Sequence, residues 1–283
     1  MWNKTDPEES FRNTVIWVAA AVVAAALVGV GVYYRFHKPH PAPAATPATI
    51  PSAATSTPTP LPGAQQTPAV QNPVPSPSAA AAASAKPLPP LNDSDPVVVA
   101  ALDGLIGHPA VARFLVPKNI IRRVVVTVDN LPRAKIAADL RPIQPTAGAT
   151  IVDRQGGITL LSARNYARYT PFVDVVGQLD VHSLAQLYFR LYPLFQQAYE
   201  SLGYPGKYFN DRLVEAIDSM LATPTVSGPV TLVRPNVFWQ YSDPKLETLP
   251  AGQKLLIRMG PQNAAIIEAK LRAFRALIAK PPQ

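Results

Sequence analysis

The feature that most constrains this chain is an uncharged apolar run at residues 14–34. As an α-helix, its 21 residues would be about 32 Å long, enough to cross a hydrocarbon core of about 30 Å. A helix satisfies its own backbone hydrogen bonds in lipid, whereas an isolated strand or loop does not. Trp17 and Tyr33 fit the aromatic positions at the two membrane interfaces. The run therefore predicts a transmembrane helix that anchors the chain in a lipid bilayer.

The residues before the run distinguish an uncleaved anchor from a cleaved signal peptide. Residues 1–13 form a polar tail that carries Asp6, Glu8 and Glu9, whereas the start of a signal peptide is short and basic. The apolar run is also longer than the 7–15 residues usual in signal peptides. We therefore expect a single-pass anchor that is retained.

Small residues recur within the run at Ala21, Ala25 and Gly29. This four-residue spacing allows two transmembrane helices to approach closely, so a weak homodimer is one expected partnership of the anchor. Positive charges do not fix the orientation of the span, because two precede it and two follow it. These four residues are Lys4, Arg12, Arg35 and Lys38.

Residues 35–90 differ sharply in composition from the rest of the chain. Fifteen of the 33 prolines lie between Pro39 and Pro90, among Ala, Ser and Thr. Such a segment has too few large apolar residues to offset the entropy lost on ordering, and its prolines favour extended polyproline II. We expect a disordered stalk over residues 35–90 and one globular domain over residues 91–280.

Composition excludes several functional classes. The chain has no cysteine, which excludes disulfides, thiolate metal sites and cysteine nucleophiles. The net charge of +8 is spread along the chain, with Arg122-Arg123 as the one compact basic run. No nucleic-acid-binding motif accompanies it, so we expect no nucleic-acid partner, and we also expect no metal and no cofactor.

Hydrophobic periodicity predicts a mainly α domain with one or two small β-hairpins, an α+β fold. A kink or a break is expected at Pro193, and Asn210 is expected to cap the helix that follows it. The predicted helices cover residues 95–106, 118–131, 181–202, 210–223, 244–249, 251–259 and 261–278, with another that begins at Thr170. A loop or a small hairpin is expected within residues 140–161, and a hairpin within residues 230–241.

Six stretches of the domain share a recognisable pattern, which includes Asn165-Tyr-Ala-Arg-Tyr169: residues 91–96, 128–131, 165–169, 192–205, 208–212 and 252–261. On these stretches the chain resembles an uncharacterised bacterial family of single-pass envelope proteins that share a domain of unknown function. The resemblance implies an anchor, a variable Pro/Ala-rich stalk and a periplasmic domain in a Gram-negative envelope. It implies no activity.

Catalytic signatures are missing from the sequence: it contains no HExxH, GxSxG, P-loop or GxGxxG motif. Asp211, Glu215 and Asp218 recur on neighbouring turns, so two carboxylates from this set or Asp180 could act on a glycan. A polar helix face explains the same spacing more simply. His182 is interpreted as a surface histidine in the same way. We assign no catalytic residue.

Aromatic residues and arginine, which dominate binding hot spots, form the other notable group. The predicted binding residues are Tyr166, Arg168, Tyr169, Tyr204, Tyr208, Trp239 and Tyr241, with Phe209 beside them. Half-buried core tyrosines are the simpler explanation for some of them. Arg258 lies in an apolar run and is expected to form a structural ion pair with Asp243 or Glu247.

Three functional hypotheses follow. The first is a non-enzymatic binding or scaffolding module, anchored in the bacterial inner membrane, that contacts an envelope protein or peptidoglycan from the periplasm. The second is a cell-wall glycan hydrolase that uses paired carboxylates. The third, a cytoplasmic domain that acts on acidic partners, requires the opposite topology.

Overall fold

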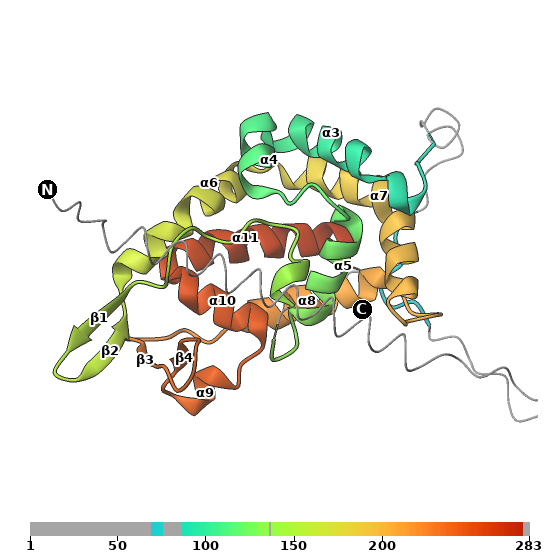
Figure 1. The fold of residues 1–283 in the computed structure, drawn as a ribbon. Helices are drawn as coiled ribbons and strands as arrows, with labels where there is room; N and C mark the ends of the chain where they lie inside the picture. Colours follow the sequence, from blue (N-terminus) through green and yellow to red (C-terminus); the bar gives the residue numbers. More distant parts are fainter. Residues whose placement is uncertain (1–68, 76–86, 136, 280–283) are drawn as a thin grey trace, which may run out of the picture. The chain divides into compact units, whose positions relative to one another are not determined.

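The computed structural model describes residues 69–75, 87–135 and 137–279 (Figure 1). These residues are mainly helical, with one small antiparallel sheet, which confirms the predicted α+β class. The α-helices are α3 (Asp95–Ile106), α4 (His108–Phe114), α5 (Ile120–Asn130), α6 (Thr170–Gln178), α7 (Val181–Ser201), α8 (Phe209–Leu221), α9 (Pro244–Glu247), α10 (Ala251–Met259) and α11 (Pro261–Ile278). Three 3₁₀ turns accompany them: η1 (Leu91–Asp93), η2 (Ala138–Leu140) and η3 (Ala163–Arg168).

Helix α4 is an element that the sequence analysis missed. The predicted helices leave residues 107–117 unassigned, because Gly107 and Pro109 are signals for the end of a helix. Gly107 does end α3, with a φ of 82° that suits glycine, but a new helix begins at His108. Proline is well tolerated in the first turn of a helix, so Pro109 is compatible with the start of α4.

Helix α7 continues through Pro193 over 21 residues, so the alternative of a break is wrong. The helix changes direction along its length, as Figure 1 shows. Proline removes one backbone hydrogen bond, but Leu191 and Leu194 on either side are buried. Burial of these side chains holds the two halves together as one bent helix.

The predicted cap of α8 is also wrong. The residue before the helix is Tyr208, and Asn210 lies inside the first turn, where it is fully buried. The backbone N–H of Phe209 donates instead to Gln196 Oε1 at 2.9 Å. A side chain of α7 therefore caps α8, which sequence spacing alone could not indicate.

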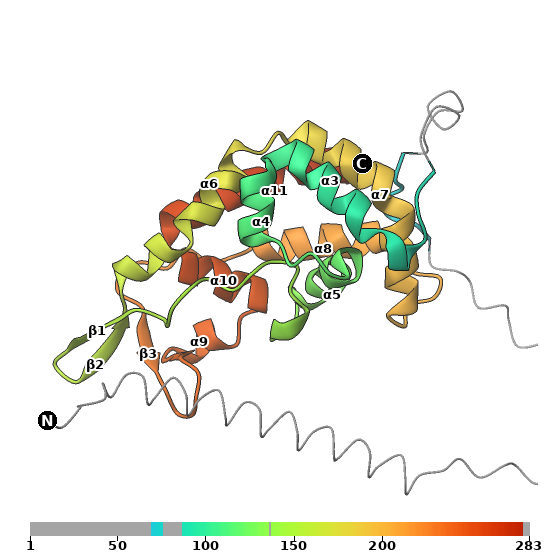
Figure 2. The same cartoon turned by 45° about the horizontal axis from the view of Figure 1, so that its top comes forward.

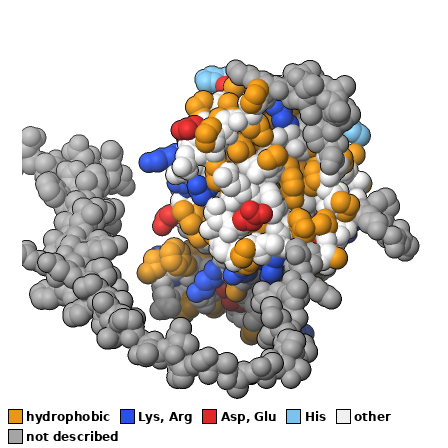
Figure 3. All heavy atoms as spheres, turned by 90° about the vertical axis from the view of Figure 1, so that its right-hand side faces the viewer, with side chains coloured by type: hydrophobic (Ala, Val, Ile, Leu, Met, Phe, Trp, Pro, Cys, Tyr) orange, Lys and Arg blue, Asp and Glu red, His pale blue; other side chains and the backbone are white. Residues whose placement is uncertain are grey.

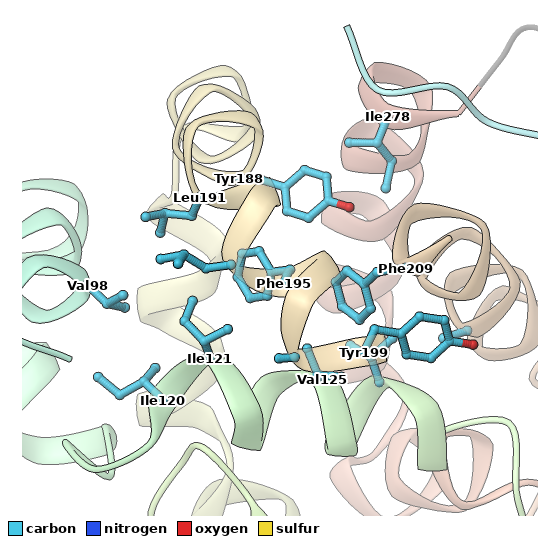
Figure 4. Close-up of a cluster of buried hydrophobic side chains, with 14 of the residues drawn as sticks. Val98, Ile120, Ile121, Val125, Tyr188, Leu191, Phe195, Tyr199, Phe209 and Ile278 are labelled. Atoms are coloured by element: carbon cyan, nitrogen blue, oxygen red, sulfur yellow. The ribbon is translucent and has the colours of Figure 1, made fainter. Parts of the chain in front are cut away.

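The main hydrophobic core lies between α5, α7, α8 and α11. Figure 4 shows aliphatic side chains of α5 facing the aromatic rings of α7 and α8. Phe195 stacks on Phe209 with ring centroids 5.4 Å apart, and Tyr199 stacks on Tyr204 at 4.7 Å. These contacts join segments far apart in the sequence into one helical body.

The two predicted hairpins are confirmed, and they join into one four-stranded sheet. The strands are β1 (Val152–Gln155), β2 (Ile158–Leu161), β3 (Thr231–Val233) and β4 (Gln240–Tyr241), in the order β1-β2-β3-β4. Antiparallel pairing of β2 with β3 aligns Thr159 with Leu232. Leu161, Leu232 and Tyr241 then bury one side of the sheet against Ile257 of α10.

Among the described residues, no helix is both long and apolar enough to cross a membrane. The predicted span at residues 14–34 and its small-residue positions lie outside the described residues. The same holds for the predicted N-terminal tail and for most of the predicted stalk. Residues 69–75, within the predicted stalk, are described and contact the domain.

Candidate functional site

The predicted aromatic and arginine residues do not meet in one site. Tyr166, Trp239 and Tyr241 belong to the hydrophobic cluster under the sheet. Tyr204 packs against the main core at the turn between α7 and α8. Tyr169 packs against a third hydrophobic cluster, so the structure divides the predicted binding group among separate regions.

At the sheet, Tyr241 has the role of a core residue. Its side chain is buried, its hydroxyl donates to the Lys254 carbonyl at 2.9 Å, and burial raises its pKa. The guanidinium of Arg258 lies 5.4 Å from the centre of this ring and donates to the Trp239 carbonyl at 3.0 Å. Trp239 is half-buried. These contacts orient the hairpin and leave little of Tyr241 for a ligand.

The expected ion pair between Arg258 and Asp243 or Glu247 does not form among the described residues. Glu247 pairs with Lys254 at 3.3 Å and accepts the backbone N–H of Tyr241 at 2.9 Å. Asp243 caps α9 by accepting the N–H of Lys245 at 2.8 Å. The carboxylates are already used by nearer donors, so Arg258 bonds to a carbonyl and a ring.

The turn η3 positions Tyr166, Arg168 and Tyr169. The guanidinium of Arg168 donates to Asn165 Oδ1 at 2.9 Å and to three consecutive backbone carbonyls, of which Gly148 is the nearest at 2.6 Å. The ring of Tyr166 packs so closely on Gly260 that a Cβ there would overlap it. This part of the predicted site fixes a loop and a helix junction.

At the turn between α7 and α8, Tyr204 joins a charged network around the buried Asp129. The Asp129 carboxylate binds Arg133 at 2.8 Å and Arg212 at 3.0 Å, and the Tyr204 hydroxyl donates to it at 3.4 Å. Arg212 also pairs with Glu215 at 2.7 Å. A buried carboxylate needs such partners, so a structural role is sufficient to explain these ion pairs.

Three of the stretches that carry the family resemblance meet in this network. Residues 128–131 supply Asp129, residues 192–205 supply Tyr204 and residues 208–212 supply Arg212. Two further stretches, residues 165–169 and 252–261, meet where η3 contacts α10: Asn165 Nδ2 donates to the Arg258 carbonyl at 3.2 Å. The resembling residues therefore hold distant elements together.

The four carboxylates considered for glycan hydrolysis are each held by a different partner. Asp180 caps α7 by accepting the N–H of Ser183 at 2.8 Å, and its hydrogen bonds to Ser183 lower its pKa. Glu215 pairs with Arg212, and Asp218 binds Arg275 through two hydrogen bonds. Asp211 accepts backbone N–H groups of residues 71 and 72. No pair is presented together to a substrate within the described residues.

Neither histidine of the described domain lies in a catalytic arrangement there. His182 is exposed at the start of α7. His108 Nδ1 lies 3.2 Å from Asp103, also at the surface. No group of three or more potential metal-binding side chains occurs among the described residues.

The basic residues are mostly engaged within the chain. Arg122 and Arg123 line a surface pocket with Asn119, Val126 and Leu140. Arg123 donates to the carbonyls of residues 118, 139 and 141, and Arg122 donates to the Asn92 side chain at 2.8 Å. Figure 3 shows charged side chains in small groups between apolar and uncharged ones, on the face that carries the C-terminal half of α7.

Several of the most exposed apolar side chains among the described residues lie on the sheet or in its β3–β4 turn. We define the sheet surface as Ile158, Val233, Val237 and Phe238, of which Phe238 is 79% exposed and Val237 68%. Because Thr159 pairs with Leu232, Ile158 and Val233 are the next opposite positions, on the face away from the buried Leu232. Val237 and Phe238 lie in the turn between β3 and β4.

Sequence reasoning missed this surface although a signal was present. It selected Trp239 and Tyr241 for their rings, but strand alternation turns Tyr241 inward. The two apolar residues that directly follow the turn Arg234-Pro-Asn236 remain outside the strands. Large apolar residues in a hairpin turn are unusual, so their position in the turn is a sequence signal for an exposed apolar surface.

Comparisons with known proteins identify the family and no activity. The model of the family described as a protein of unknown function (DUF3014) matches residues 120–275. No curated protein matches the chain, and no solved structure does. The matched region runs from α5 into α11 and includes the sheet, the Asp129 network and the sheet surface. Because it covers more than half of the 283 residues, the chain belongs to this family of unknown function.

Proposed function

We propose that this protein is a non-enzymatic binding module of the bacterial envelope, anchored by one helix in the inner membrane with its domain in the periplasm. The apolar run at residues 14–34 supports the anchor, and the Pro/Ala-rich segment that follows supports presentation at a distance. The family resemblance favours the periplasmic side. Membership of a family of unknown function is compatible with these assignments.

The observation that carries the binding role is the sheet surface. Monomeric domains rarely leave large apolar side chains grouped and exposed, and such groups commonly mark contact sites. Phe238 and Val237 project from a hairpin that Arg234 braces, since its guanidinium donates to the Val237 carbonyl at 3.0 Å and lies 5.6 Å from the Trp239 ring. A braced apolar turn costs little entropy to bind.

The chemistry of this surface favours a protein partner over peptidoglycan. Sugars stack on the open faces of Tyr and Trp rings, but Tyr241 is buried and Trp239 is half-buried. Branched aliphatic side chains and one phenylalanine instead match an apolar protein surface. We therefore name an envelope protein as the partner class.

Two measurements test the proposal. A reporter fused after Gln283 should be active only in the periplasm; activity only in the cytoplasm would contradict the location. Full-length protein extracted in mild detergent should co-purify a partner that the variant Phe238→Ser retains at least about tenfold less well, as expected for loss of a hot spot of about 1.4 kcal/mol or more.

The control is Leu202→Ser, which alters a different exposed apolar residue, just beyond the end of α7. Equal recovery of the partner with both variants would show that the sheet surface is not the contact. Retention of the native protein on purified peptidoglycan, with no protein partner recovered, would overturn the choice of partner class.

A further inference from the structure

A short segment of the predicted stalk lies against the N-terminal end of α8. The backbone N–H groups of Gln71 and Asn72 donate to the two carboxylate oxygens of Asp211, at 3.2 and 2.7 Å. The side-chain amide of Asn72 donates to the same carboxylate at 3.1 Å. One carboxylate thus binds three donors from two consecutive residues.

The neighbouring residue, Asn210, binds the same segment from inside the domain. Its side chain is 0% exposed, and its Oδ1 accepts the Tyr188 hydroxyl at 2.8 Å. Its Nδ2 donates to the carbonyl of Ile278 and to the carbonyl of Asn72, each at 2.9 Å. Asn72 therefore satisfies an amide proton of a buried side chain, and a buried donor without a partner is unfavourable.

The sequence of the segment suits this contact. The chain bends at Gln71 and Asn72, and Pro73 restricts the backbone conformations open to Asn72, whose N–H and carbonyl both face α8. Proline also reduces the entropy that the free segment would lose on binding. Gln71 contributes its backbone N–H to Asp211, so its side-chain identity matters less than the presence of that N–H.

We propose that Asn210 and Asp211 form a recognition site for a bent Gln-Asn-Pro peptide, and that its occupant is residues 71–73 of the same chain. The site recognises two consecutive backbone N–H groups, one carbonyl and an asparagine side chain. It acts as a latch that joins the stalk segment to the domain at α8.

The latch determines which end of the domain is joined to the stalk segment. Figures 1 and 2 show residues 69–75 and the sheet at opposite ends of the domain. Attachment at α8 leaves the sheet surface free and directed away from the point of attachment. This consequence rests on the proposed function, whereas the latch itself does not.

Amide hydrogen exchange of the full-length protein in lipid nanodiscs tests the latch. In the native protein the amides of residues 71 and 72 should be protected, and Asp211→Asn should accelerate their exchange by at least about tenfold because the carboxylate acceptor is lost. Glu215→Gln, on the same helix, is the control and should leave that exchange unchanged. Equal exchange in all three proteins would overturn the proposal.

A second pair of variants acts from the side of the segment and leaves α8 intact. Gln71→Pro removes the N–H that donates to Asp211, whereas Gln71→Ala retains it. We expect faster exchange at residue 72 with proline and native exchange with alanine. Native exchange in both variants would contradict the assigned donor.

Dilution separates the two sources of the occupant. A segment from the same chain gives protection independent of protein concentration, whereas a segment from a second copy gives protection that falls on 100-fold dilution. The second result would overturn the assignment to the same chain. The exchange and dilution measurements depend on no partner and no compartment. Failure of the latch can therefore be distinguished from failure of the proposed function.

Discussion

The helical body and the sheet end use similar residues in opposite ways. In the helical body, Phe209 is 1% exposed and the Asp129 carboxylate is buried between two arginines. At the sheet end, Phe238 is 79% exposed, and the Asp153 carboxylate pairs with Arg164 at the surface. Burial determines what each group contributes: the body supplies stability, and the sheet end carries the exposed surface that we propose for contact.

Two phenylalanines give the largest expected contrast. Phe209→Ala should lower the free energy of unfolding by about 3–5 kcal/mol, because it removes a ring that stacks on Phe195 in the core. Phe238→Ala should change it by less than about 0.5 kcal/mol, since its ring is already in water. Denaturant unfolding of the two variants checks both values. Comparable losses would abolish the distinction between the regions.

Two aspartates sharpen the same contrast for charge. Asp129→Asn should cost about 3 kcal/mol or more, because it leaves the Arg212 guanidinium without its buried counter-charge. Asp153→Asn should lower the free energy of unfolding far less, as expected for a solvent-exposed ion pair. Thermal unfolding of both variants at low ionic strength would show the difference. A small effect of Asp129→Asn would mean that solvent or another residue replaces its role.

A pair of glycines tests the junction between the two regions. Gly260→Ala should lower the free energy of unfolding, measured by denaturant unfolding, by about 2–3 kcal/mol. The backbone φ at this position is +85°, and the new methyl group would overlap the Tyr166 ring. Gly148→Ala has a similar φ of +77° but no atom within 4 Å, so it should cost only the backbone strain of about 1 kcal/mol. Equal costs would show that the Tyr166 ring moves aside.

Two buried tyrosines, one in each region, give the smallest effect, visible only at alkaline pH. Burial raises the pKa of Tyr188 in the body and of Tyr241 at the sheet above the usual value of about 10. The folded state then retains protons that the unfolded chain loses, so stability is complete below about pH 10 and falls as pH rises further.

Replacement of either tyrosine by phenylalanine should make that alkaline fall less steep, and replacement of both should reduce it further. Unfolding measured from pH 8 to 11 for the native and variant proteins gives the slopes. An unchanged slope in both single variants would show that other groups control the alkaline limit.

Local sequence patterns predicted much of the fold because its elements begin and end at strong local signals. Ser94 and Pro96 start α3, and Gly260 with Pro261 divides α10 from α11. Glu268 and Arg272 form an ion pair at 2.8 Å, as their i,i+4 spacing on one helix favours. Such features depend on residues within one or two turns of each other.

The rest depended on contacts between distant residues. The pairing of β2 with β3 joins residues 159 and 232, and Asn210 is buried by Tyr188 and Ile278 rather than exposed as a cap. The predicted binding group was chosen by residue type. Tyr241 and Arg168 have the right chemistry for recognition, but tertiary contacts use them within the fold.

Site-specific photo-crosslinking in living cells tests the central claim most directly. A photoreactive residue placed at position 238 should give a discrete crosslinked product with an envelope protein. The same residue at position 202, also exposed but at the end of α7, should give little of that product. Equal crosslinking at both positions, or a product formed only at position 202, would contradict the assignment of the sheet surface as the contact site.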